Sequence, residues 1–247
     1  MLSNPQNSPS PGMMEAGLHE RLAMVRQRIA RAAEAAGRDV RSITLLAVSK
    51  GQDATHIRTA LAQGLTEFGE NYVDEALPKI RQLAGTPARW HFIGRLQANK
   101  TRPVAEHFAW AHSIDRLRTA ERLSAQRPID APPLNVCVQV HVADDPAKGG
   151  VAPADALVLL QQIALLPRLA LRGLMCMLPY EASEAAQHAG FARLAAIAAE
   201  ARRAGLPLDT LSMGMSADLE TAVAEGATIL RIGTALFGER AALLPST

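Results

Sequence analysis

The feature that most constrains the fold is a regular alternation of short apolar segments with longer amphipathic ones. Eight apolar segments have the composition of buried strands: 43–49, 65–69, 89–94, 108–113, 134–142, 169–175, 209–213 and 228–232. Ala-rich segments with helical spacing separate them: 53–63, 71–84, 98–106, 115–126, 153–166, 182–204 and 216–225. Strands that alternate with helices predict a parallel sheet built from right-handed crossovers. Eight strands in about 190 residues favour a closed (β/α)8 TIM barrel, an α/β fold, over an open sheet.

We expect a single domain with an extra helix at its start. This helix is predicted over 14–36 by apolar residues at helical spacing, namely Leu18, Leu22, Val25 and Ile29. No linker, repeat or composition shift divides the remaining chain, so the barrel domain is predicted to span 14–240. The Pro- and Ser-rich segment 1–13 is expected to be a disordered tail, and 241–247 a C-terminal tail. The second and fourth strands have the weakest patterns, and losing either would favour an open sheet.

Charge and cysteine content exclude several classes of protein. The 26 basic and 24 acidic residues are mixed, without the Lys/Arg blocks of nucleic-acid-binding proteins. Cys137 and Cys176 lie inside apolar runs, as buried thiols of a reducing compartment do, so we expect neither a disulfide nor a metal site. No apolar run is long enough to cross a membrane, and the first residues lack the pattern of a signal peptide. We therefore expect a cytoplasmic protein, and a closed barrel of this size favours a monomer.

The first predicted strand ends on a lysine, Lys50, after the apolar run 43–48. Barrel active sites lie at the C-terminal ends of the strands, so Lys50 falls on the working face. Partial burial lowers an ammonium pKa, and an uncharged amine attacks carbonyl groups. The pattern is therefore compatible with a Schiff-base lysine. The alternative is a lysine that only extends to solvent from a strand end.

The loops after the last two predicted strands resemble a phosphate cradle. They read Leu-Ser-Met-Gly-Met-Ser over 211–216 and Arg-Ile-Gly-Thr over 231–234. Glycines let the backbone approach an anion, hydroxyls donate to its oxygens, and these two loops are a recurrent phosphate site in barrels. The alternative is that Ser216 only caps the following helix, with Asp218 and Glu220 complementing the helix dipole.

Arg231 interrupts the otherwise apolar final strand. A guanidinium cannot be neutralised by burial, so an inward arginine needs an acceptor. That acceptor could be a protein carboxylate or the ring nitrogen of a bound pyridine. A reactive lysine, a phosphate cradle and a ring-nitrogen partner together describe a site for pyridoxal 5'-phosphate (PLP).

The chain also resembles a known family through motifs spread from residue 45 to residue 238. These are LLAVSK (45–50), FGENYVDEALPKI (68–80), WHFIGRLQANK (90–100), PPLNVCVQV (132–140), RGLMCM (172–177), LSMGMSADLE (211–220) and RIGTALFG (231–238). They are similar to those of the PLP homeostasis proteins, also called the proline synthase co-transcribed or alanine-racemase N-terminal-domain-like family. The resemblance implies the alanine racemase barrel, PLP fold type III.

The resemblance also implies roles for individual residues. It implies a PLP aldimine on Lys50, Asn71 beside the cofactor and Arg231 at the pyridine nitrogen. The implied phosphate contacts are Ser212, Met215, Ser216, Gly233 and Thr234. Lys148, in the setting Lys-Gly-Gly, is similar to a second lysine proposed to exchange with PLP. Arg95 departs from the family pattern, in which Pro or His is common, and this leaves the anion preference of its loop open.

Two further polar residues of these motifs are interpreted as structural. His91 alternates with Trp90 and Phe92, which indicates a histidine of the core or the barrel mouth with satisfied hydrogen bonds rather than a base. Glu70 is expected to anchor the loop that presents Asn71.

A carrier is favoured over an enzyme, with no catalytic residue assigned. A racemase needs a second base opposite the lysine; in alanine racemases it is a tyrosine from a further domain. Only nine residues follow Gly238 here, and neither Tyr72 nor Tyr180 matches that tyrosine. Arginine at the pyridine nitrogen also keeps the ring unprotonated, which makes it a poor electron sink.

The expected function is therefore PLP homeostasis, with delivery to PLP-requiring apo-enzymes. A small amino-acid racemase and a cofactor-free Schiff-base aldolase are the alternatives.

Overall fold

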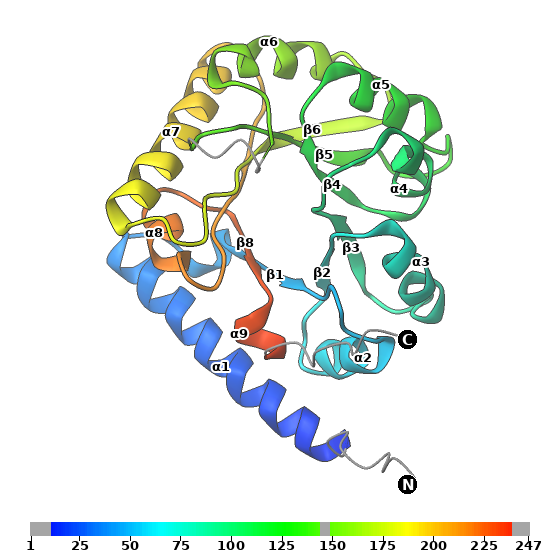
Figure 1. The fold of residues 1–247 in the computed structure, drawn as a ribbon, viewed down its shortest axis with the longest axis vertical. Coiled ribbons are helices and arrows are strands. Elements are labelled where there is room, and N and C mark those ends of the chain that lie inside the picture. The colour runs from blue at the N-terminus through cyan, green and yellow to red at the C-terminus, as the bar shows by residue number, and fades with distance from the viewer. Residues whose placement is uncertain (1–10, 144–148, 239–247) are drawn as a thin grey trace, which may run out of the picture.

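A computed structural model describes residues 11–143 and 149–238 of the chain. Lys148, residues 1–10 of the predicted disordered tail and the predicted C-terminal tail 241–247 lie outside the described residues. In the described part of the chain, the helices and strands alternate as the sequence predicts, and the helices surround the barrel (Figure 1).

Eight parallel strands close into a barrel in chain order. The strands are β1 (Thr44–Val48), β2 (Glu67–Glu70), β3 (Arg89–Phe92), β4 (Trp110–Ile114), β5 (Leu134–Gln139), β6 (Leu169–Met175), β7 (Thr210–Ser212) and β8 (Ile229–Ile232). The barrel closes where β1 pairs with β8, and there Leu46 lies beside Arg231. The predicted closed barrel is therefore confirmed, including its second and fourth strands.

The helices follow the predicted order with two short additions. They are α1 (Pro11–Ala35), α2 (Ala54–Ala62), α3 (Val73–Gln82), α4 (Thr101–His107), α5 (Leu117–Gln126), α6 (Pro153–Ala164), α7 (Glu184–Arg203), α8 (Leu219–Ala224) and α9 (Thr234–Phe237), with 3-10 turns η1 (Val40–Ser42) and η2 (Ala98–Lys100). Neither α9 nor η1 was expected, since four and three residues are too short to show a period. Helix α1 begins at Pro11, three residues before the start at residue 14 that the helical spacing predicts.

The N-terminal helix lies across the outside of the barrel, against α8 and α9 (Figure 1). Its apolar face is buried, as the helical spacing of Leu18, Leu22 and Val25 predicts. Arg28 forms an ion pair with Glu220 of α8 and also donates to the backbone oxygen of Ser216 (3.0 Å). Helix α1 therefore braces the two loops in which a phosphate cradle is predicted.

Both cysteines are free, buried thiols, as their apolar neighbours predict. Burial raises the pKa of the Cys176 thiol to about 12 and that of Cys137 further still, so neither is a reactive thiolate. Within residues 11–143 and 149–238, no group of His, Cys, Asp and Glu could hold a metal ion. No helix in the same part of the chain is both long and apolar enough to cross a membrane.

Candidate functional site

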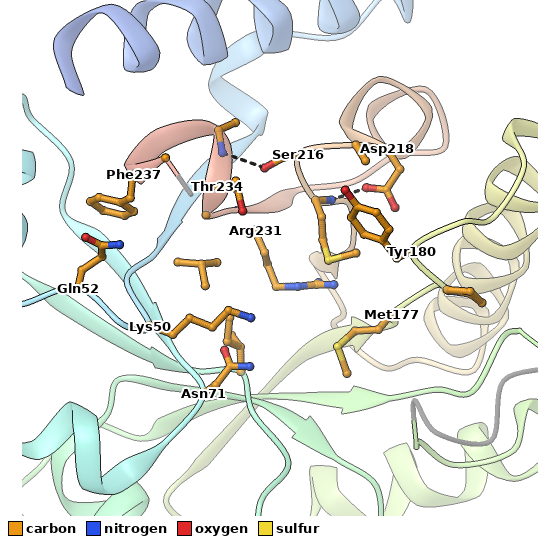
Figure 2. Close-up of a pocket in the computed structure, with 18 of the residues that line it drawn as sticks. Lys50, Gln52, Asn71, Met177, Tyr180, Ser216, Asp218, Arg231, Thr234 and Phe237 are labelled. Atoms are coloured by element: carbon orange, nitrogen blue, oxygen red, sulfur yellow. Dashed lines mark hydrogen bonds between the residues drawn. The ribbon is translucent and has the colours of Figure 1, made fainter. Parts of the chain in front are cut away.

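A cavity of about 700 Å³ opens at the C-terminal ends of the strands, between β1, β2, β8 and the loop before α8. Seven of the eight cofactor-binding residues predicted within the described chain line it: Lys50, Asn71, Met215, Ser216, Arg231, Gly233 and Thr234. In Figure 2, Lys50 and Asn71 lie on one side of Arg231, and Ser216 and Thr234 lie on the other. The structure thus brings together residues that are up to 184 positions apart in the chain (50 to 234).

Lys50 follows β1. One buried lysine and two glutamates hold the backbone of the residues before and after it. Lys79 of α3 donates to the backbone oxygen of Ser49 at 2.9 Å, to Glu70 at 2.9 Å and to Glu75 at 2.6 Å. We call Lys79, Glu70 and Glu75 the Lys79 cluster. It fixes the direction in which Lys50 leaves the strand.

Both glutamates of the Lys79 cluster reach the residues next to Lys50. Glu70 accepts from the Ser49 hydroxyl at 2.6 Å, and Glu75 accepts from the backbone N–H of Gly51. Burial raises the pKa of Glu70, although Lys79 and the Ser49 hydroxyl oppose the shift. Glu70 therefore supports the segment of Lys50, whereas its anchoring of the Asn71 loop stays a prediction.

Asn71 faces the cavity from the end of β2 (Figure 2). Its Oδ1 atom is buried and has no hydrogen-bond partner among the described residues. A buried amide oxygen without a partner costs free energy unless a ligand or water satisfies it. The backbone of Asn71 passes close to Gly94. A Cβ atom added at Gly94 would lie 2.0 Å from the backbone oxygen of Asn71. The site therefore requires glycine at position 94 and presents an unsatisfied polar group to a ligand.

Arg231 enters the cavity from β8 and is only 5% exposed. One terminal nitrogen, Nη1, donates to the backbone oxygen and to the hydroxyl of Ser212, and Nη2 donates to the backbone oxygen of Cys176 at 2.8 Å. Among the described residues, no carboxylate lies within ion-pair distance of this guanidinium. The carboxylate partner that the sequence left open is therefore not found in this part of the chain, and a buried cation faces the cavity.

Ser212 is the one predicted phosphate contact that does not line the cavity. Its side chain is fully buried inside the barrel, where its Oγ atom lies 2.9 Å from Arg231 and 2.8 Å from His112 Nδ1. Successive residues of a strand point to opposite faces, and this one points into the barrel interior. In this structure Ser212 supports Arg231, and its predicted phosphate contact stays a prediction.

The loop before α8 also differs from the prediction. Helix α8 begins at Leu219, and Ser216 lies outside it and accepts from the backbone N–H of Ala235 in α9 at 3.4 Å. The backbone N–H of Met215 donates to Asp218 (Figure 2). Burial raises the pKa of Asp218, a shift that Met215 and Arg231 oppose. The sequence assigned Asp218 only to the helix dipole, whereas it lines the cavity.

Comparison with known proteins places the chain in a family. The family model described as "Alanine racemase, N-terminal domain" matches residues 21–241. A pyridoxal phosphate homeostasis protein of Pseudomonas aeruginosa is 56% identical over 221 residues, covering 90% of this chain and 95% of that protein. One from Escherichia coli is 50% identical over 223 residues, covering 89% and 95%. The chain belongs to the pyridoxal phosphate homeostasis protein family.

Solved structures agree with this assignment. PipY from Synechococcus elongatus, solved with PLP bound, is 40% identical, with a TM-score of 0.80 over 90% of this chain and 100% of that one. An alanine racemase from Corynebacterium glutamicum has a TM-score of 0.68 at 18% identity and covers 93% of this chain and 63% of that one. The second likeness shows a shared barrel fold, as the resemblance implies.

Tyr180 is a cavity residue that the sequence set aside. It lines the cavity and is 81% exposed, whereas Tyr72 is 64% exposed and does not line it. In Figure 2, Tyr180 lies beyond Arg231 as seen from Lys50. Its position after β6 was the only available signal, because the family motif at 172–177 ends three residues earlier.

Proposed function

We propose that this chain binds PLP in the cavity, holds it covalently through Lys50, and serves PLP homeostasis without robust catalysis. The observation that carries the proposal is the buried Arg231 guanidinium, which faces Lys50 across a cavity and has no carboxylate partner among the described residues. A buried cation without an ion-pair contact is costly unless a ligand supplies an acceptor. The proposal is supported by the PLP-bound state of PipY, a relative of this chain.

The residues present fit the chemical groups of PLP. Arg231 would face the ring nitrogen, and the unpartnered Asn71 amide oxygen would gain a partner beside the ring. Ser216, Gly233 and Thr234 would hold the phosphate, since two hydroxyls and a glycine backbone gather there. A cavity of about 700 Å³ lies within the range of cofactor sites, roughly 300–1,000 Å³. When bound, PLP supplies an aldehyde that reacts with primary amines and a ring that can withdraw electrons.

The carrier role rests on what Arg231 does to this chemistry. A guanidinium that donates to the ring nitrogen prevents its protonation, because two positive charges would then lie at hydrogen-bonding distance. The ring would then withdraw electrons poorly and favour reversible attachment over further reaction. Delivery to PLP-requiring apo-enzymes in the cytoplasm is part of this proposal. A monomer is also proposed, because a closed single-domain barrel of this size can stand alone.

An amino-acid racemase is the second candidate, and one observation favours it. The Tyr180 phenol lines the same cavity as Lys50, so a second proton-transfer group is available. Racemisation of an L-amino acid by the purified protein, faster than by free PLP and lost in Tyr180→Phe, would establish this activity. A rate no higher than that of free PLP would favour the carrier.

The test of the cofactor and its attachment is borohydride reduction of the purified, PLP-loaded protein, followed by peptide mass mapping. We expect visible absorbance before reduction and a single labelled peptide that contains Lys50. Lys50→Ala is expected to abolish both signals, whereas Lys100→Ala, at a lysine paired with the exposed Asp74, should keep them. A colourless wild-type protein would contradict the proposal and favour the cofactor-free aldolase. A label on another lysine would contradict the assignment of Lys50.

A further inference from the structure

A continuous chain of hydrogen bonds crosses the barrel interior from its amino-terminal end to the cavity. Glu67, the first residue of β2, contacts His91 Nε2 through Oε2 at 2.6 Å. His91 Nδ1 lies 2.9 Å from His112 Nε2, and His112 Nδ1 lies 2.8 Å from Ser212 Oγ. The chain ends at Arg231, 2.9 Å from the Ser212 hydroxyl. We call its first four members the relay: Glu67, His91, His112 and Ser212.

Burial favours the neutral form of both histidines of the relay. His91 is 1% exposed and His112 is fully buried. Burial lowers the pKa of His91 against the opposing effect of Glu67, and it lowers the pKa of His112 further, with help from His91 and Arg231. Glu67 keeps its charge, because His91 and Arg89 outweigh the effect of burial and leave the pKa of Glu67 below its ordinary value.

A neutral imidazole has one donor and one acceptor nitrogen, so the carboxylate of Glu67 fixes the direction of every bond in the relay. A carboxylate only accepts, so His91 must carry its proton on Nε2 and accept at Nδ1. His112 must then donate from Nε2 and accept at Nδ1. The hydroxyl of Ser212 therefore donates to His112.

The last step determines what Ser212 offers to Arg231. Its hydroxyl proton points to His112, so an oxygen lone pair is left for the guanidinium, which can only donate. The ring plane of His91 is held by stacking on Trp110, at 5.3 Å between centroids and 7° between planes. Glu67 thereby controls the hydrogen bonding of a residue at the opposite end of the barrel.

We propose that the relay is a positioning device in which Glu67 sets the hydrogen-bond direction that holds the Arg231 guanidinium toward the cavity. The effect on bound PLP rests on the proposed function, whereas the direction of the relay is a property of the protein alone. The two parts can therefore be tested separately.

An isosteric substitution, Glu67→Gln, is expected to reverse the relay. The other carboxylate oxygen of Glu67, Oε1, accepts from Arg89 at 3.0 Å. In the variant, the amide oxygen is expected to keep this bond, which leaves the NH2 group facing His91. His91 must then accept at Nε2, and both histidines change to the Nδ1–H tautomer. Ser212 would then accept from two donors, and its own proton would lose the His112 acceptor.

The first experiment is 15N NMR of histidine-labelled protein without PLP. The signals of His91 and His112 are assigned among the seven histidines by single substitutions to Gln. We expect both residues as Nε2–H tautomers in the wild type and as Nδ1–H tautomers in Glu67→Gln. Asp209→Asn is the matched control, since it removes a carboxylate paired with Arg172 before β7 that contacts no relay member. An Nδ1–H tautomer of either histidine in the wild type would overturn the proposal, as would unchanged tautomers in Glu67→Gln.

The second experiment measures PLP affinity and the absorbance spectrum of the loaded protein. We expect Glu67→Gln to weaken binding about three- to tenfold, the effect of one weakened hydrogen bond, and to shift the spectrum. Ser212→Ala, which removes the last member, is expected to act in the same direction, and Asp209→Asn to change neither. Reversed tautomers with unchanged PLP binding would overturn the positioning role. Absence of PLP binding in the wild type would instead refute the proposed function and leave the tautomer result intact.

Discussion

Lys50 and Arg231, the two nitrogen-bearing side chains that line the cavity from neighbouring strands, are held by different interactions. Lys50 stands at the end of β1, where the charged Lys79 cluster grips the backbone on both sides. Arg231 stands on the neighbouring strand β8, held by neutral acceptors: the Ser212 hydroxyl and two backbone oxygens. We call the Lys50 side of the cavity, fixed by ion pairs, the charged wall, and the Arg231 side, fixed by uncharged acceptors, the neutral wall.

This difference indicates what each wall is built to do. The Lys79 cluster bonds to the residues on both sides of Lys50, so it fixes a backbone position. Neutral acceptors orient Arg231 without an ion-pair contact, so its guanidinium can still donate to a ligand in the cavity. A site that used carboxylates on both sides would hold Arg231 as firmly and attract a cofactor ring less.

The largest expected effect comes from breaking the charged wall. Lys79→Met leaves the fully buried side chain of Glu70 without its cation. We expect the free energy of unfolding to fall by about 3 kcal/mol, as for other buried ion pairs that lose one partner. Urea unfolding at pH 7 measures it, and PLP attachment should weaken as well, since Ser49 loses its backbone contact.

The matched control for Lys79→Met is Lys100→Met. Lys100 pairs with Asp74, whose side chain is 78% exposed. Exposed ion pairs contribute roughly 0–1 kcal/mol, so this variant should stay near the wild type. Equal effects of the two substitutions would show that the Lys79 cluster does not hold the charged wall.

The two histidines of the relay behind the neutral wall are expected to make the stability of the protein depend on pH. The pKa values of His91 and His112 in the folded protein lie below the ordinary value of 6.5, so the unfolded chain binds protons more readily. Their contribution to stability is present above about pH 6.5 and is lost as the pH falls toward the folded-state values. Each histidine contributes a slope of up to about 1.4 kcal/mol per pH unit. Glu70, whose pKa is raised by burial, acts in the opposite sense, because its contribution is lost as the pH rises above 4.5.

His112→Gln tests this assignment by urea unfolding between pH 5.5 and 7.5. We expect the slope of the free energy of unfolding against pH to become shallower by up to about 1.4 kcal/mol per pH unit. His107→Gln, at an exposed histidine of α4, controls for the loss of a histidine as such. A slope equal to that of the wild type in His112→Gln would show that this histidine is not kept neutral by burial.

The sequence predicts the barrel, its strand order and most of the cavity, because these depend on short-range patterns. Lys50 and Arg231 stand out as polar residues in apolar strands, and a strand-end position is enough to place them near the site. Ser212 shows the limit of this reasoning. Whether a strand residue lines the cavity or lies deeper in the barrel interior depends on strand tilt and register. A single sequence does not specify either of them.

The relay was beyond sequence reasoning for a related reason. His91 was correctly interpreted as a satisfied core histidine, but its partners Glu67 and His112 are 24 and 21 positions away and on different strands. Asp218 was missed because an acidic residue at a helix start already has an ordinary explanation. Tertiary register, which places such residues side by side, is the information that a single sequence lacks.

The smallest effect is expected from a substitution of Arg89, which pairs with Glu67 at the start of the relay. This substitution tests which of the two residues sets the direction of the relay. Arg89 is 52% exposed and pairs with Glu67 at 3.0 Å. In Arg89→Gln the carboxylate remains, and a carboxylate still only accepts, so His91 must keep its proton on Nε2. We expect unchanged tautomers, PLP affinity within about twofold of the wild type and a loss of stability below about 1 kcal/mol.

We expect the loss of Lys79 from the charged wall to lower stability more than the loss of Arg89 from the relay behind the neutral wall. Loss of Lys79 leaves a buried carboxylate without its cation, whereas loss of Arg89 leaves one that is 17% exposed and still bonded to His91. 15N NMR of the Arg89→Gln protein decides the point. Reversed tautomers there would assign the direction of the relay to the guanidinium instead of the carboxylate, and Glu67 would no longer be its determinant.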